Sequence, residues 1–196
     1  MEETAKNGTW EDTYGAINDY MNKQIILLLK KLIELNQQLL VYYIKRMETQ
    51  SEQGKRIYEV AFSFLGKDVT PRDNTPDAVA CMEVVNEIVR LATGKPIGGG
   101  ASTYLGFAAL HDEKRFLKIN RYNSFYSPLA GDIIISPAGY STKGYKNGHV
   151  GIVGKHHVLS NFSDTGKLED YYTIETWEKQ FGEIMGFPVF YFRVIS

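Results

Sequence analysis

The hydrophobic pattern of this chain changes its period once, and that change limits the possible folds more than any single motif does. As far as His111 the apolar residues recur at helical spacing, whereas from Phe116 onward they form short strand-like runs. These runs are RFLKI, GDIIIS, GHVGIVG, HHVLSNF and PVFYFRVI, and a helical pattern over Thr173–Phe181 interrupts them. Helices first and strands second predict an α+β fold, with helices packed on an antiparallel sheet.

Residues 1–50 carry a pattern of their own. From Ala16 to Gln50 there is neither glycine nor proline, and one set of apolar residues alternates between spacings of four and three, as in a coiled-coil seam. We expect an extra long N-terminal helix that associates with further copies of the chain as a homo-oligomer. Docking on a membrane or a partner would cover the same apolar face, and packing on its own domain is the alternative. The seam residues are Met21, Ile25, Leu28, Leu32, Leu35, Leu39 and Tyr42, and a second stripe beside them comprises Ile26, Leu29, Ile33, Leu40 and Ile44.

Charge and composition exclude several classes of function. The net charge of −1 gives no basic field for nucleic acid. The single cysteine excludes an internal disulfide and a cysteine-rich zinc site, and we expect no metal and no other cofactor. Lys30, Lys31 and Glu34 interrupt the longest apolar stretch, so we expect no integral membrane segment. The first residues, MEETAKNGTWEDTYG, do not resemble a secretory signal, and we expect synthesis in the cytoplasm.

Cys81 is the first candidate for chemistry. It lies about one turn inside a helix predicted from Asp77 to Ala92. A thiol in that place feels the positive end of the helix dipole, which favours the nucleophilic thiolate, and nearby backbone N–H groups could hold an oxyanion. The alternative is a small buried core residue. Glu83, two positions further on, is expected to face outward.

His149 and Asn161 are the candidates for the base and its orienting group. His149 begins a predicted strand directly after the glycine-rich segment AGYSTKGYKNG, and Asn161 lies in the next predicted strand. A three-residue loop over 154–156 would set His149 opposite Asn161, with both side chains on one face of the sheet. The amide could then hold the imidazole in the tautomer that takes a proton from the thiol. A loop longer by one residue would put Phe162 there instead, and Asp164 is the second candidate for the orienting group.

In this order, the segments DAVACMEVVNEI, LAGDIIISPAG, NGHVGIVG and LSNFSDTG resemble NlpC-type cell-wall peptidases and their CHAP (cysteine- and histidine-dependent amidohydrolase/peptidase) relatives. The C-terminal part looks like that of phage-type lysins, or endolysins. The resemblance covers residues 56–196, which we expect to be a cysteine hydrolase domain with a papain-like core. It implies that Cys81 is the nucleophile, His149 the base and Asn161 the orienting residue. One departure is that Ala-Cys-Met stands where many relatives carry Asp-Cys-Ser, so no oxyanion donor beyond the backbone is assigned.

The resemblance also implies a substrate and a reaction. Such enzymes cleave an amide bond of peptidoglycan without a cofactor, so the expected partner is the stem peptide of the cell wall, reached once the protein is delivered there. Tyr104, Tyr140 and Tyr145 lie near or on glycine-rich segments and could form the walls of a substrate groove; ordinary surface aromatics are the alternative.

Two other classes of function stay open at this point. One is a non-catalytic, helix-mediated oligomeric protein that binds the wall or serves as a scaffold. The other is an intracellular papain-like amidase that acts on proteins. His156 and His157 are expected to be solvated at a hairpin tip, because adjacent residues on a strand point to opposite faces and cannot share a metal with His149.

Overall fold

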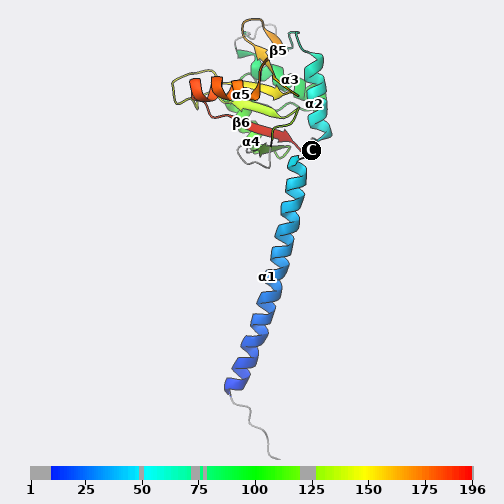
Figure 1. Cartoon of the computed structure of the whole chain (residues 1–196), viewed down its shortest axis with the longest axis vertical. Helices are drawn as coiled ribbons and strands as arrows, with labels where there is room; N and C mark the ends of the chain where they lie inside the picture. Colours follow the sequence, from blue (N-terminus) through cyan, green and yellow to red (C-terminus); the bar gives the residue numbers. More distant parts are fainter. Residues whose placement is uncertain (1–9, 49–50, 72–75, 77–78, 120–126, 196) are drawn as a thin grey trace, which may run out of the picture. The chain divides into compact units, whose positions relative to one another are not determined.

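The structure is a computed structural model that describes residues 10–48, 51–71, 76, 79–119 and 127–195. The chain divides into two compact units, Met1–Lys45 and Arg46–Ser196. The described helices are α1 (Trp10–Glu48), α2 (Glu52–Ser63), α3 (Cys81–Thr93), α4 (Thr103–Asp112), α5 (Ile174–Trp177) and the π-helix η2 (Glu178–Ile184). The strands are β1 (Phe116–Ile119), β2 (Ile133–Ser136), β3 (His149–Val153), β4 (Val158–Phe162), β5 (Lys167–Tyr172) and β6 (Phe190–Val194) (Figure 1).

The helix α1 accounts for the described part of the first unit. It contains no proline and only one glycine, Gly15, so its backbone ladder has no sequence-encoded break. The apolar side chains from Met21 to Tyr42 are about half exposed or more. Across the described residues, no helix combines the length and the apolar character that crossing a bilayer requires.

The second unit is built on a sheet of six described strands in the order β1-β6-β2-β3-β4-β5, and every neighbouring pair is antiparallel. The prediction of an α+β fold with an antiparallel sheet is confirmed. The edge strand β5 was not predicted, because its sequence KLEDYY buries only Leu168 fully and therefore lacks the apolar alternation of a half-buried strand. The predicted helix start at Asp77 lies outside the described residues, and α3 itself begins at Cys81.

Helices cover both faces of this sheet, and Figure 1 shows the strands between α2 on one side and α5 on the other. On the first face, α2, α3 and α4 pack on the alternate strand residues that include Ile133, Val150 and Leu159. On the second face, Trp177 and Phe181 pack on strand residues of the opposite parity. Successive strand residues point to opposite faces, so the two clusters divide the strands residue by residue.

A buried ion pair joins the beginning of β2 to the end of β6 on the second face. The Arg193 guanidinium donates through Nε and Nη2 to the two carboxylate oxygens of Asp132, at 3.0 and 2.8 Å. The Leu129 amide donates to the same carboxylate at 2.7 Å, and Arg193 also donates to the Ser127 carbonyl at 3.0 Å. Both charged residues are almost completely buried. The pair therefore has hydrogen-bond partners that offset much of the desolvation cost of two buried charges.

Removing one member of this pair should destabilise the fold strongly. Asp132→Ala leaves the Arg193 guanidinium buried without its counter-ion, which typically costs about 3–5 kcal/mol. Urea unfolding followed by fluorescence measures the change in the free energy of unfolding. Glu87→Ala is the matched control, because it breaks a more exposed ion pair with Arg90 on α3 and should cost less than about 1 kcal/mol. Equal losses in the two variants would contradict the role assigned to the buried pair.

Candidate active site

Cys81 is the first residue of α3, and it lies in the core between α3 and the sheet with only 6% of its surface exposed. Burial raises the pKa of the thiol to about 11. The backbone amides of Val150, Met82 and Cys81 itself oppose that rise, because an N–H group directed at the sulfur favours the thiolate. The thiol is therefore protonated at neutral pH, with three backbone amides around it.

Of these three amides, that of Val150 shows that Cys81 lies at the beginning of β3. The Val150 amide belongs to the peptide group that follows His149, so the sulfur lies beside the first peptide of the strand. The loop before β3 is held close by: the Ala138 amide donates to Thr103 Oγ1 of α4 at 3.1 Å. A Cβ on Gly148 would lie only 2.4 Å from the Ala138 nitrogen, so this approach requires glycine. Parts of α3, α4 and the β2–β3 loop thus meet where β3 begins.

His149 lies at the start of β3, opposite Ser136 of β2, and its imidazole belongs to an aromatic cluster. Its ring stacks against those of Trp177 and Phe181, with centroids 5.0 Å from each. Trp177 is itself fixed by a hydrogen bond from its indole nitrogen to Ser136 Oγ at 3.2 Å. Burial lowers the pKa of the imidazole to about 4, so the ring is neutral at neutral pH.

The register of β3 and β4 differs from the prediction. The structure sets Ile152 opposite Leu159 and connects the strands by a four-residue loop, 154–157. A hydrogen bond of 2.8 Å from the first amide of this loop to its last carbonyl closes it. The predicted three-residue loop is therefore wrong, and so is the predicted register of His149 with Asn161. The extra loop residue shifts the pairing by one position, which reverses the face of every β4 side chain relative to β3.

This shift places the three predicted catalytic residues on two faces of the sheet. Asn161 is buried and pairs with Leu168, which lies in the core cluster under α3 together with Val150. Asn161 therefore shares a face with Cys81, while the His149 ring stacks on the α5 side of the sheet. Asp164, the second candidate for the orienting group, is exposed in the turn after β4.

Among the described residues, the groups that shift the pKa of Cys81 do not include His149, and those that shift the pKa of His149 do not include Cys81. Burial alone accounts for the lowered pKa of His149. The structure thus brings Cys81 to the strand that His149 begins, in a state where thiol and imidazole are both neutral. A neutral imidazole can accept a proton from a neutral thiol once the two groups meet.

Two of the three predicted substrate-binding tyrosines lie together. The rings of Tyr104 on α4 and Tyr140 in the β2–β3 loop stack with centroids 5.9 Å apart, and Phe107 packs edge-on against Tyr140. Both tyrosines are close to half exposed. Tyr145 is also exposed, and its backbone amide donates to Ser141 Oγ at 3.2 Å. The Tyr104–Tyr140 pair offers an exposed aromatic surface where α4 meets the loop that leads into His149.

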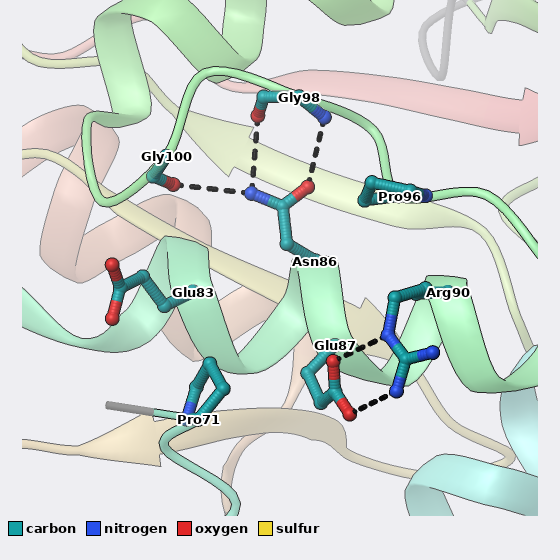
Figure 2. Close-up of a pocket in the computed structure, with 8 residues that line it drawn as sticks. All are labelled: Pro71, Glu83, Asn86, Glu87, Arg90, Pro96, Gly98 and Gly100. Carbon is teal, nitrogen blue, oxygen red and sulfur yellow. Dashed lines mark hydrogen bonds and ion pairs between the residues drawn. The ribbon is translucent and has the colours of Figure 1, made fainter. Parts of the chain in front are cut away.

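A small pocket that was not predicted lies on the outer side of α3, with a volume of about 190 Å³ (Figure 2). Asn86 fixes one wall, because its side chain donates to the Gly98 and Gly100 carbonyls and accepts from the Gly98 amide. Glu83 lines this pocket and is only 3% exposed, so the expectation that it faces outward is wrong. The glycine-rich segment after α3 was visible in the sequence, but nothing there indicated which helix residue it would contact.

No protein-family model matches the sequence, and no curated protein matches it at a significant level. In the part of the chain that the structure describes, no group of three or more His, Cys, Asp and Glu side chains is arranged to hold a metal ion. Any functional assignment therefore depends on the residues around Cys81 and His149 themselves.

The partly buried His149 imidazole should make stability depend on pH. In the unfolded chain His149 takes up its proton near pH 6.5, but in the folded chain only near pH 4. The unfolded state thus binds more protons between these values, and stability that is fully present above pH 6.5 is lost as the pH falls to 4. The shift corresponds to on the order of 3 kcal/mol. Urea unfolding between pH 4 and 7 measures it.

His149→Phe keeps an aromatic ring in the cluster but cannot bind a proton, so this variant should lack that part of the pH dependence. His157→Gln in the exposed β3–β4 loop is the control and should retain it. An unchanged pH profile in His149→Phe would show that the imidazole is not held neutral by burial.

Proposed function

We propose that this chain is a cysteine-dependent amidohydrolase with a papain-like arrangement, which cleaves an amide bond in the peptide part of peptidoglycan. One observation carries the proposal: the sulfur of Cys81 lies at the first residue of a helix, among three backbone amides, beside the peptide that follows His149. A thiol among backbone N–H groups at a helix start suits attack on a carbonyl, because the same N–H groups can hold the oxyanion that forms. The ordered sequence segments around Cys81 and His149 supply the substrate class.

The two pKa shifts favour general-base catalysis over a preformed ion pair. The thiol pKa is about 11 and the imidazole pKa about 4, so both groups are neutral over the range between. In the proposed first step His149 takes the thiol proton while the sulfur forms a bond to the substrate carbonyl. The amides of Cys81 and Met82 then stabilise the oxyanion.

The remaining steps complete the turnover. The protonated imidazole gives its proton to the leaving amine as the C–N bond breaks, which leaves a thioester on Cys81. Water, with His149 again as base, then attacks this thioester and restores the free thiol. The exposed Tyr104–Tyr140 pair is the proposed surface on which the substrate rests before the reaction.

In the described structure the site around Cys81 and His149 is closed, so the proposed reaction requires this site to open. Cys81 is almost covered, and the His149 ring packs in the aromatic cluster with Trp177 and Phe181. Substrate binding must therefore uncover the sulfur and bring the imidazole to it. Catalytic hydrogen bonds are often formed only in the complex with substrate, so their absence from a free enzyme is compatible with this role.

Digestion of purified peptidoglycan, followed by mass spectrometry of the released fragments, tests the proposal. The full chain should release peptide fragments with newly formed carboxyl and amino ends. Cys81→Ala should reduce the rate by at least about a thousandfold, because the nucleophile is gone, and His149→Ala should have a similar effect. His157→Ala should leave the rate unchanged, and thermal unfolding should show that the variants are folded. A Cys81→Ala variant with undiminished release would contradict the proposal.

The burial of Cys81 favours a second candidate, a non-catalytic protein that binds the cell wall or serves as a scaffold. A thiol that is 6% exposed with a pKa near 11 is also what a core cysteine would show. The same experiment separates the two functions. Cosedimentation of the unaltered chain with peptidoglycan, without release of any fragment, would support the second candidate.

A further inference from the structure

Most apolar residues of α1 between Met21 and Tyr42 fall into two seams, whereas Leu27 and Val41 at c positions lie outside both. The first seam, from Met21 to Tyr42, occupies the a and d positions of a heptad repeat, with Ile25, Leu32 and Leu39 at a. The second seam lies one residue further along the chain at b and e positions and comprises Ile26, Leu29, Ile33 and Leu40. One residue corresponds to a rotation of about 100° around an α-helix, so the two seams are separated by about that angle.

Both seams are free of charge. The charged residues between Met21 and Tyr42 are Lys23, Lys30, Lys31 and Glu34, and all four fall at c, f or g positions on the remaining side of the helix. Identical helices can therefore pack seam against seam without burying a charge or bringing like charges together. Asn36 is a polar residue at an e position within the second seam, where it would set the register of packing at some cost in stability.

The exposed area of the seams is large enough for stable association. The eleven seam residues between Met21 and Tyr42 are each 49% to 66% exposed. Together they offer on the order of 1,000 Å² per chain, divided between two neighbours with the larger share on the seven-residue first seam, compared with about 800 Å² per partner in one standard protein–protein interface. An apolar surface of this size on a charged helix indicates an interaction site.

We propose that α1 assembles the chain into a homotetramer through a bundle of four α1 helices. A helix with one seam packs on one neighbour, whereas a helix with two seams about 100° apart packs on two neighbours and closes a ring. Four helices in a bundle lie at about 90° to one another around its axis, which matches the angle between the seams. The occupant of each seam is thus a further copy of this chain, and the assembly does not depend on the proposed hydrolase activity.

Light scattering coupled to size-exclusion chromatography tests the stoichiometry of the full chain. The expected mass is about four times that of one chain. Leu28→Glu places a charge at a d position of the first, larger seam and should give monomers, because the four residues of the second seam bury too little area to hold the helices alone. Ile33→Glu alters only the second seam and should leave dimers held by the first. Gln37→Glu, at an f position outside both seams, is the control and should remain tetrameric.

Several results would overturn the proposal. These are a monomeric or dimeric unaltered chain, an unchanged mass for either seam variant, and a monomeric Ile33→Glu variant, which would mean that the two seams are not separate. Monomers of the unaltered chain that bind vesicles containing anionic lipid would show that a membrane surface covers the helix instead. Near-UV circular dichroism of each variant should match the unaltered chain, because all three substitutions lie in the unit that precedes Arg46.

Discussion

The packing of α3 against the beginning of β3 is the contact on which the candidate site depends. The helix buries most of its first two turns against the first face of the sheet, and this fixes Cys81 beside the His149–Val150 peptide. The close approach of α4 to α3 also requires a glycine, because a Cβ on Gly106 of α4 would lie 2.4 Å from the Met82 sulfur. The contacts that pack the core therefore also determine the position of the Cys81 thiol.

That packing has opposite effects on the chemistry of the thiol. Burial disfavours the thiolate, whereas the helix start and the backbone amides favour it, and burial is the larger effect. The imidazole of His149 is held neutral by the same cause on the other face. A neutral pair is stable in the core and becomes reactive only when a proton can move between its members. On this account the resting protein is protected from unwanted thiol chemistry, and substrate binding supplies the missing contact.

The sequence allowed the class of fold to be predicted, because helical and strand-like periods were well separated along the chain. It also indicated that β3 begins at His149, since glycine-rich residues precede an apolar run there. The β3–β4 register could not be predicted reliably, because it depends on one loop residue, and the hydrogen bond between Gly154 and His157 decides the loop length. The consequence is large, since one residue moves Asn161 from the face of His149 to the face of Cys81.

The surroundings of Cys81 and His149 could not be predicted from the sequence either. A cysteine at a helix start has the same local pattern whether its sulfur is open to solvent or sealed by a sheet. The aromatic neighbours of His149 come from α5 and η2, more than twenty residues away in the chain, and no periodicity connects them to it. The pairing of Tyr104 with Tyr140 likewise depends on the contact between α4 and the β2–β3 loop.

The most direct test of the central claim is the pH profile of Cys81 alkylation by a chloromethyl ketone of the stem peptide, which occupies the substrate site as it reacts, with and without His149. If His149 is the base, the rate should rise as the imidazole loses its proton near pH 4, and His149→Ala should react at least about tenfold more slowly at pH 7. If the sulfur is only a core thiol, the rate should instead follow a single ionisation near pH 11, with no difference between the two proteins. That second result would contradict the account.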